Sequence, residues 1–421
     1  MRSNLRILFV GTEISLKNSP EGIVSRALLE GFIRSGCKVD LISPYLPDNI
    51  EGLNQHFSYN AKENFVVNKL YKKITGFEGG GFYDYCCNLV GGMDINEYDV
   101  VFIRSDPVSL HRLALFVNDK FGKQCVCSFG DVGSVNPYYS GGLLTSLRKK
   151  NLVNLERKLV AGGNIVTQTN QRSIDLYRDA GFDVSRFCVL PNPIVSSVDR
   201  TQKLLTAEEL VGYPTPVSQC YASVVSTAGK HKQNVAFIGS FYGERKPDAM
   251  LEFFSGRDDV ALHVFGGVRN ILFEKNGFAY RWMREKGLEN LTKSAEKEGV
   301  KNFYIWPFMP IALINSLVVN QFDGLINVDA NFKPNPFLSS KVVQYLSYNK
   351  SVFNFSNEGA TVDLLKEAGI EYFIDYSNPV RDASPFFEIS EKTRPTIDLA
   401  DYYSRESVVQ RFMDSYAKEN I

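Results

Sequence analysis

Short apolar runs that alternate with helix-type patterns limit the possible folds of this chain more than any other feature. Residues 5–10 form the first run, and a polar loop, a helix pattern at 23–36 and a second apolar run at 37–44 follow it. Gly22 and Gly36 bracket the helix pattern, as expected for helix boundaries. A strand, a crossover helix and a second strand in this order predict parallel strands of one sheet. The loop lacks the glycine spacing of a dinucleotide-binding site, so a dehydrogenase is not supported.

The same alternation continues along the chain. Further strand signals are present at residues 99–103, 124–129, 164–168, 235–240, 260–267, 302–308, 322–329, 351–357 and 371–377. Two successive series of parallel-strand signals predict an α/β protein with two doubly wound, Rossmann-like domains facing a cleft. The pattern of apolar residues in 48–92 is less regular, so loops and helices are expected there without defined boundaries. The last pattern, 405–419, predicts a helix with no strand after it.

The stretch 234–254 is the strongest candidate for a binding site. Its apolar run 235–238 predicts a buried strand, and a helix pattern begins at Pro247. A predicted turn at 239–243 lies between them, followed by Arg245 and Lys246. Loops at the carboxyl ends of parallel strands are where open α/β sheets bind ligands, and backbone N–H groups point into that crevice. Two cations there predict an anion site, and the alternative is an ordinary turn with a solvated Arg and Lys.

Other strand ends also carry polar residues. Arg104 and Asp106 follow the strand signal at 99–103, and Asp131 follows the one at 124–129. Such residues are placed to contact a ligand, but an aspartate in this position also serves as the N-cap of the next helix. Both interpretations of Asp106 and Asp131 remain open at this point.

Composition excludes several classes of protein. The chain has 47 Lys plus Arg and 47 Asp plus Glu, so no overall positive field favours nucleic acid. Its cysteines, 37, 86, 87, 125, 127, 188 and 220, are odd in number and several lie in apolar runs, which is typical of reduced thiols in a cytoplasmic protein. No cleavable signal peptide is evident, and no run reaches the roughly 18 apolar residues of a membrane span. A soluble, cytoplasmic location is expected.

The pattern at residues 143–159 predicts a long helix in which Arg148, Lys149, Lys150, Arg157 and Lys158 stand among leucines. A basic amphipathic helix of this kind lies on an anionic membrane surface in some proteins. In others it is a solvated face above a core stripe. The sequence leaves both open, so peripheral attachment at the inner face of the membrane is an expectation to be tested.

Taken in order, these elements resemble a known family. Its motifs are Gly22 in the first helix, the segment 155–194, the loop GSFYGERK at 239–246 and the segment 339–353. The last is similar to the pattern PSK-x-x-E-Y-L-A-x-G-K-P-V. The chain is thereby identified with nucleotide-sugar-dependent glycosyltransferases of the GT-B type, most like retaining family 4 (glycosyl transferases group 1). The resemblance covers nearly the whole chain.

The resemblance implies domains and site residues. An acceptor domain is expected at 1–195, a connection or insertion at 196–233 with a helical piece at Ala207–Leu210, a nucleotide-sugar domain at 234–395, and a helix returning to the N-terminal domain at 396–421.

Arg245 and Lys246 would hold the donor's diphosphate, whose developing charge prepositioned cations stabilise, with Asp131 as a further catalytic residue. The donor-binding residues implied are Gly22, Gly239, Ser240, Pro307, Phe308, Met309, Asn335, Ser340, Lys341 and Gln344, with the base against residues 307–309. Arg104 and Asp106 would lie on the acceptor side, and neither a metal nor a cofactor is expected.

The chain departs from the family at three positions. The family's two glutamates fall here at Asn335 or Pro336 and at Gln344, so both acids are missing. Amides still bond to hydroxyls, but without charge assistance. The family's histidine before Asp131 is replaced by Gly130. The remaining histidines in strand-like or helix-like runs, His111 and His263, are more typical of structural positions.

Three functions are compatible with these residues. The leading hypothesis is transfer of a hexose-type unit, with retention, from a nucleotide sugar to a glycan or lipid-linked acceptor in polysaccharide or glycoconjugate biosynthesis. In it, closure of the cleft excludes water. The missing acids motivate the second, a catalytically silent scaffold that binds sugar nucleotides in a polysaccharide assembly complex. The third is a nucleotide-sugar epimerase on the same fold.

Overall fold

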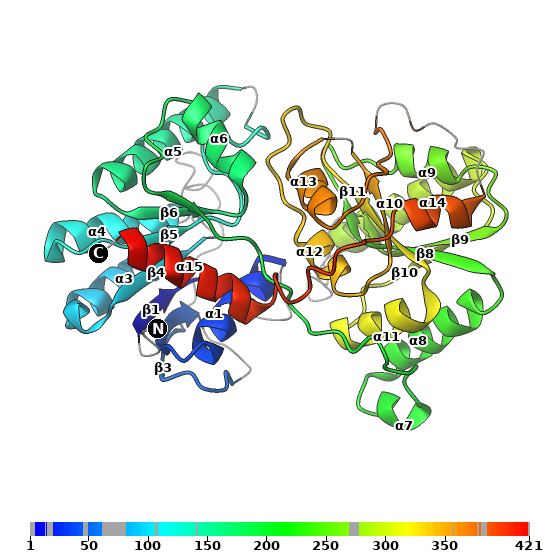
Figure 1. The fold of residues 1–421 in the computed structure, drawn as a ribbon, viewed down its shortest axis with the longest axis horizontal. Coiled ribbons are helices and arrows are strands. Elements are labelled where there is room, and N and C mark those ends of the chain that lie inside the picture. The colour runs from blue at the N-terminus through cyan, green and yellow to red at the C-terminus, as the bar shows by residue number, and fades with distance from the viewer. Residues whose placement is uncertain are drawn as a thin grey trace. The chain divides into compact units, whose positions relative to one another are not determined.

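The chain forms two compact units in its computed structural model (Figure 1). The structure describes residues 5–12, 14, 20–44, 49–60, 81–105, 108–139, 142–268, 278–356, 358–376, 379 and 385–419. The N-terminal unit comprises Met1–Val195, Pro336–Ser340 and Asp401–Ile421. The C-terminal unit comprises Ser196–Asn335 and Lys341–Ala400. The segment 196–233 therefore belongs to the C-terminal unit.

A parallel sheet of seven described strands, in the order β3-β2-β1-β4-β5-β6-β7, is the centre of the N-terminal unit. The strands are β1 Arg6–Val10, β2 Lys38–Pro44, β3 Gln55–Tyr59, β4 Val100–Arg104, β5 Val126–Ser128, β6 Ile165–Gln168 and β7 Phe187–Val189. The central strands β1, β2 and β4 are mostly apolar and buried on both faces, as parallel strands covered by helices require, whereas the edge strand β3 is polar and only partly buried. All strands that the sequence predicted in this half are confirmed, whereas β3 and β7 were not foreseen.

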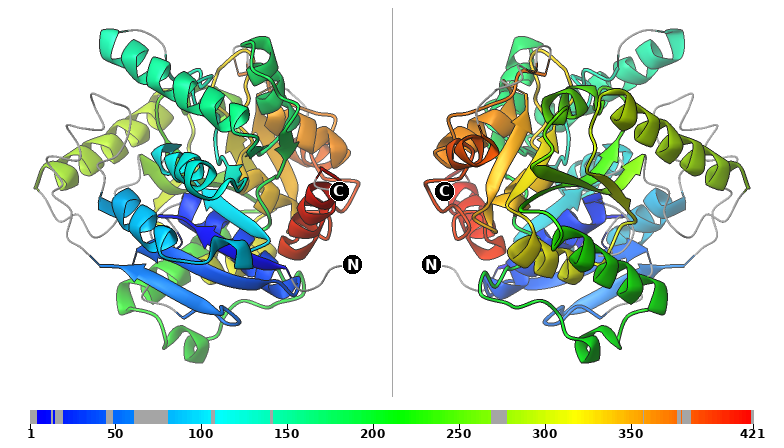
Figure 2. Two further views of the ribbon diagram at one scale, coloured as in Figure 1. Left: turned by 90° about the vertical axis from the view of Figure 1, so that its left-hand side faces the viewer. Right: turned by 90° about the vertical axis from the view of Figure 1, so that its right-hand side faces the viewer.

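Helices cover both faces of this sheet (Figure 2). They are α1 Pro20–Arg34, α3 Gly81–Gly91, α4 Arg112–Phe121, α5 Leu143–Ala161, α6 Gln171–Asp179 and α15 Arg405–Glu419, with single 3-10 turns at Ile95–Glu97 and Val108–His111. Helix α15 lies against α1, and its Phe412 ring meets Phe32 and Phe102 edge to face, with centroids 6.1 and 5.9 Å away. The C-terminal helix thus returns to the N-terminal unit, as predicted.

The C-terminal unit contains a second parallel sheet, of five described strands, in the order β10-β9-β8-β11-β12. The strands are β8 Gln233–Phe241, β9 Val260–Val268, β10 Phe303–Trp306, β11 Gly324–Val328 and β12 Ser351–Phe355. The strand predicted at 371–377 is wrong for its described part, because among residues 371–376 only Ile374 pairs, in an isolated bridge to Phe355. The prediction of two Rossmann-like sheets is otherwise confirmed.

The helices of this unit are α7 Ala207–Leu210, α8 Thr215–Ala228, α9 Asp248–Phe254, α10 Phe278–Lys297, α11 Ile311–Gln321, α12 Ser340–Leu346, α13 Ala360–Glu367 and α14 Phe386–Lys392. One apolar core fills the space between the sheet and helices α9, α10 and α14, with Phe237, Phe253 and Phe353 among its fully buried rings. Helix α7 occupies the predicted residues, and its Thr206 and Glu209 form a capping box. Helix α8 was missed because the stretch around it is rich in Ser, Thr and Val.

Candidate functional site

The candidate site lies at the carboxyl edge of the second sheet. All its strands are parallel, so their carboxyl ends share one edge, where doubly wound proteins bind ligands. Residues predicted to bind the donor follow these ends in sheet order. They are Pro307, Phe308 and Met309 after β10, Gly239 and Ser240 near the end of β8, and Ser340 and Lys341 at the start of α12. The fold therefore brings three separate sequence motifs to one edge.

Two glycines leave room at this edge for side chains from other elements. Gly239 and Gly266 are paired across β8 and β9 and have φ angles of 149° and 103°. A Cβ atom on Gly239 would lie 2.1 Å from Nζ of Lys341, and one on Gly266 would lie 2.3 Å from Cζ of Phe308. Only glycine fits such conformations and approaches without strain. A long cation and an aromatic ring consequently lie directly on the backbone of neighbouring strands.

The basic turn after β8 has a geometry that the sequence did not predict. Residues 239–241 continue the strand, and the turn occurs at Tyr242–Arg245, where the N–H of Arg245 donates to the carbonyl of Tyr242 at 2.9 Å. Nη1 of Arg245 donates to the Tyr242 hydroxyl at 3.1 Å. Arg245 is half-buried, whereas Lys246 is exposed and held through its backbone N–H, which donates to the hydroxyl of Tyr376 at 2.8 Å. The two adjoining cations thus have different environments.

Lys341 is a second cation, beside Arg245, at the carboxyl edge of the second sheet. Its Nζ lies 5.2 Å from the ring centroid of Phe237, in addition to its contact with Gly239. Burial and the nearby guanidinium of Arg245 lower the pKa of Lys341 to about 7, and Asp329 acts in the opposite direction. An anion placed here would be attracted by both cations and would restore full charge to the lysine.

Asp329 is a site residue that sequence reasoning missed. It follows β11 and is 1% exposed, and burial raises the pKa of its carboxyl group while Arg245 opposes that shift. Oδ1 accepts from Nδ2 of Asn327 at 2.9 Å and from the Thr361 hydroxyl at 3.3 Å. The available signal was its place directly after a buried strand, the same signal that identified Asp131.

The amides that stand where the family has acids are used within the protein. Gln344 accepts from the Ser196 N–H at 3.1 Å and donates to the Ser196 carbonyl at 2.9 Å. Asn335 is 1% exposed and donates to the Ala330 carbonyl at 3.1 Å. Pro336 belongs to the N-terminal unit, where its carbonyl accepts from Asn170 at 2.8 Å. These contacts order the backbone around the site. An ionised glutamate or aspartate at Gln344 or Asn335 could not donate the hydrogen bonds to the carbonyls of Ser196 and Ala330, because a carboxylate only accepts.

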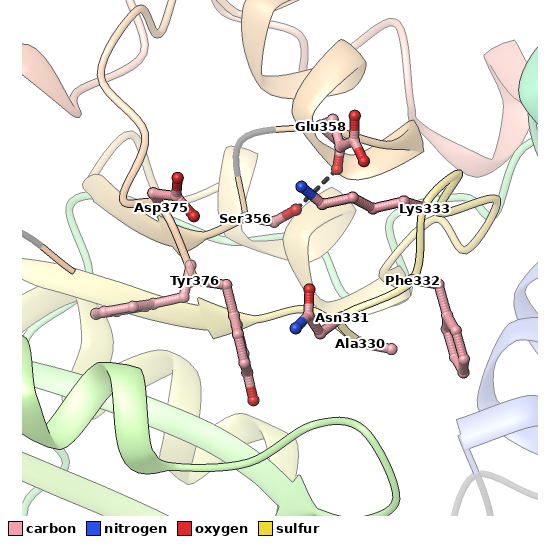
Figure 3. A pocket seen from close by; sticks show the side chains of 9 residues that line it. Ala330, Asn331, Phe332, Lys333, Ser356, Glu358, Asp375 and Tyr376 are labelled. Carbon is pink, nitrogen blue, oxygen red and sulfur yellow. Dashed lines mark hydrogen bonds between the residues drawn. The ribbon is translucent and has the colours of Figure 1, made fainter. Parts of the chain in front are cut away.

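A small hollow lies beside this edge (Figure 3). It is lined by Ala330, Asn331, Phe332, Lys333, Phe355, Ser356, Glu358, Asp375 and Tyr376. Lys333 points toward Ser356 and Glu358, and the Ser356 hydroxyl donates to the Glu358 carbonyl at 2.7 Å. The hydroxyl of Tyr376 connects this hollow to the basic turn through its bond with Lys246. Within the described residues no three His, Cys, Asp or Glu side chains gather as a metal site.

The N-terminal unit has its own polar cluster. Arg104 is 1% exposed, its Nε lies 2.8 Å from Oε1 of Glu21, and its Nη1 donates to the Ser128 hydroxyl at 3.0 Å. Gly22 is next to Glu21 in α1, and Asp131 is exposed in the loop after β5. Asp106 lies outside the described residues. The structure thus joins Arg104 to Glu21, an acidic partner that sequence reasoning did not name.

The structure explains the missing histidine of this unit. A Cβ on Gly130 would lie 2.5 Å from Oε2 of Glu21 and 3.1 Å from Nη2 of Arg104, so this ion pair occupies the space of a side chain. His111 is fully buried against the Phe129 ring at 4.2 Å, and burial lowers its pKa to about 3. His263 is also fully buried and takes a hydrogen bond from Trp306 at 3.0 Å. Both histidines have the structural environment that the sequence favoured.

Glu156 on α5 is a buried acid that holds the loop after β5. Its Oε1 accepts from the Ser134 N–H at 2.8 Å and from the Tyr177 hydroxyl at 2.9 Å. Burial raises the pKa of Glu156 from its ordinary 4.5 to about 7 despite these hydrogen bonds. Between these two pH values the folded protein holds more protons than the unfolded chain, so this carboxyl group's contribution to stability falls as pH rises.

We therefore expect Glu156→Gln to gain stability relative to the wild type as pH increases from about 4.5 to 7, by at most about 3 kcal/mol. Urea unfolding at several pH values measures this difference. Glu208→Gln, at an exposed position on α7, is the matched control and should show no such trend. A pH-independent difference for Glu156→Gln would contradict the prediction.

Solved structures similar to the whole chain are known, although no family model and no curated protein sequence matches it. Anabaena Alr3699/HepE in complex with UDP-glucose is 12% identical, with a TM-score of 0.64 over 98% of this chain and 100% of that one. Sucrose-phosphate synthase from Thermosynechococcus elongatus is 11% identical, with a TM-score of 0.66 over 98% of each chain. WaaG, a glycosyltransferase involved in lipopolysaccharide biosynthesis, is 13% identical, with a TM-score of 0.61 over 97% of this chain and 99% of that one. The likeness establishes a shared fold.

Proposed function

We propose, from the GT-B fold of this chain and the cations at its second sheet, that it is a glycosyltransferase acting on a nucleotide sugar. The donor binds the C-terminal unit and a glycan or lipid-linked acceptor binds the N-terminal unit. The reaction transfers a hexose-type sugar, with retention as the family resemblance implies, in polysaccharide or glycoconjugate biosynthesis. The neighbouring structure that holds UDP-glucose supports a nucleotide-sugar donor.

The observation that carries this proposal is the pair Arg245 and Lys341 beside Gly239. In the transfer, the bond between the anomeric carbon and the diphosphate breaks, and an acceptor hydroxyl oxygen takes its place. The nucleoside diphosphate leaves with the negative charge, and the hydroxyl proton is released. Prepositioned cations lower this barrier because they stabilise charge that develops in the transition state. The two side chains are held by Tyr242 and Phe237, so little reorganisation is needed.

The base and ribose are assigned to the neighbouring strand ends. Phe308 is 37% exposed and lies on Gly266, so its ring offers an apolar surface beside the backbone of β9. Pro307 and Met309 flank it and are half-buried. Ser240 and Ser340 lie near the diphosphate and provide hydroxyl donors. Because Gln344 and Asn335 bond to protein backbone, we propose that they shape the donor site and do not replace the family's glutamates.

Calorimetry and turnover with UDP-, GDP-, ADP- and dTDP-sugars test the proposal, each with and without candidate acceptors. A transferase binds at least one of them, hydrolyses it slowly alone and transfers its sugar when an acceptor is present. Binding with neither hydrolysis nor transfer would indicate a silent scaffold. Conversion of the donor sugar in the absence of acceptor would indicate an epimerase. If no sugar nucleotide binds, the proposed function is wrong.

We also propose that the first half of α5 attaches the protein to an anionic membrane surface. Leu143 and Leu147 are 79% and 44% exposed there, beside the exposed Lys149 and Lys150. The second half buries its leucines, so the apolar surface and the charges coincide only at the start of the helix. Such a surface favours the interface of anionic lipids. No helix in the described ranges is long and apolar enough to cross a bilayer.

Lys149→Glu with Lys150→Glu should reduce co-sedimentation with phosphatidylserine vesicles more than tenfold, since each charge near such a surface contributes about 1 kcal/mol. High salt should have the same effect on the wild type. The matched control reverses Lys230 and Lys232, two exposed lysines before β8, and should bind like the wild type. Absence of wild-type binding at low salt would reject the proposal.

A further inference from the structure

The carboxylate of Asp329 has an unusual position for a residue beside a proposed diphosphate site. It is 1% exposed, and its Oδ2 accepts no hydrogen bond from the described residues. A buried carboxylate oxygen without a partner is costly, and natural proteins keep few of them. An anion next to a site for an anionic ligand also opposes binding. A purely structural account therefore leaves both costs unexplained.

The carboxylate is held firmly in place. Its Oδ1 receives bonds from Asn327 and Thr361, and Nδ2 of Asn327 also donates to Oδ1 of Asn354 at 2.6 Å. Nδ2 of Asn354 in turn donates to the Ser356 carbonyl at 3.1 Å. This chain of hydrogen bonds joins β11, β12 and α13, and fixes which oxygen of Asp329 remains open. Ala330, the next residue, lines the hollow of Figure 3.

Two cations act on this carboxylate from different elements. β11 pairs with β8 in the register Ile326–Phe237, so Asp329, which follows β11, lies beside the end of β8, where Lys341 rests on Gly239. Arg245, in the turn after β8, and Lys341, on α12, both attract the carboxylate, and Arg245 has the larger effect on its pKa. Neither forms a direct ion pair with it among the described contacts, so Asp329 acts at a distance. Arg245 and Lys341 repel each other, and both Asp329 and Arg245 act on the ammonium of Lys341. Asp329 is therefore the group that offsets this repulsion.

We propose that Asp329 is a positioning residue, whose buried carboxylate holds the ammonium of Lys341 on Gly239 and keeps it protonated to a higher pH than burial beside Arg245 alone would allow, until the donor's diphosphate arrives. The inference rests on the proposed function, because it names how that same site is kept ready. Without this carboxylate, burial and Arg245 would discharge Lys341 already below neutral pH, so that at pH 7 the diphosphate would meet mainly one cation in place of two. The protonated Lys341 that Asp329 maintains before the donor binds attracts the diphosphate, and this attraction offsets the repulsion between Asp329 and the bound anion.

The affinity for UDP-glucose between pH 5 and 8.5 tests this inference, because neither the diphosphate nor the uracil ring of this ligand changes its protonation in that range. The wild type should bind less tightly as pH rises and Lys341 loses its proton. Asp329→Asn should move the midpoint of this loss to lower pH by about one unit, since one nearby charge is removed. Well below the midpoint its affinity should equal or exceed that of the wild type, because a negative charge near the diphosphate is gone.

Two further variants separate charge from structure. Thr361→Val removes a hydrogen bond to Asp329 but keeps its charge, so its midpoint should match the wild type. Asp329→Asn combined with Lys341→Arg should bind without an alkaline loss, because a guanidinium stays charged over the whole range. A purely structural role for Asp329 predicts no such rescue.

An unchanged or raised midpoint in a folded Asp329→Asn protein overturns the inference. If that variant does not fold, Lys341→Arg is measured by itself. An alkaline loss of affinity that persists in Lys341→Arg shows that Lys341 is not the titrating group and overturns the inference. Wild-type protein that binds none of the four classes of sugar nucleotide overturns the proposed function, and this inference with it. Wild-type binding with an unshifted midpoint overturns the inference alone.

Discussion

Arg245→Ala is expected to lower kcat/KM for the nucleotide-sugar donor by about 10²–10³, the largest effect on activity that the structure predicts for one residue. Arg245 is half-buried and its Nη1 is fixed by the Tyr242 hydroxyl, so its charge is already in place when the leaving diphosphate forms. Because such a group acts mainly on charge that develops in the transition state, kcat should fall more than KM rises. Steady-state kinetics with the best donor measures both.

Lys246→Ala is the internal control for this prediction. Lys246 neighbours Arg245 in sequence, but its side chain is exposed and only its backbone is anchored, by Tyr376. We expect a loss of less than about tenfold, since water screens an exposed charge. Both variants should unfold at the wild-type temperature. Equal losses for the two variants would contradict this distinction, and an active Arg245→Ala protein would remove the main support for the site.

Phe412→Ala is expected to destabilise the N-terminal unit by about 3–5 kcal/mol, the largest effect on stability predicted here. Phe412 is 3% exposed and packs edge to face with Phe32 of α1 and Phe102 of β4. Removal of its ring leaves a cavity between α15, α1 and the sheet, which rigid neighbours cannot fill. Chemical unfolding, followed by a probe in the N-terminal unit, measures the loss.

The matched control is Phe387→Ala, which makes the same substitution in α14. Phe387 is 53% exposed, so its replacement should change the free energy of unfolding by less than about 0.5 kcal/mol. If Phe412→Ala were as stable as this control, the contact of α15 with α1 would not contribute to the fold. Arg405, which pairs with Glu30 near the start of α15, would then be the next residue to test.

The sequence predicted most of the regular structure because local pattern specifies it. Buried parallel strands such as β1 and β8 read as apolar runs, and α5 and α15 have helical periodicity that needs no tertiary information. Helix α8 has many β-branched and small residues, so its propensity is low and its packing against α11 stabilises it. The segment 371–377 has the composition of a strand, but among its described residues only Ile374 pairs with a neighbouring strand.

The candidate site was only partly visible in the sequence. By itself the chain determined that cations and glycines follow the strands of a second parallel sheet, because these positions are fixed by pattern and spacing. Only the tertiary structure decided that Lys341 lies on Gly239, that Gln344 binds the backbone of Ser196, and that Asp329 is buried beside the cations. The physical reason is that charge, burial and hydrogen bonding depend on neighbours in space, and strands β8, β11 and helix α12 become neighbours only when the sheet forms.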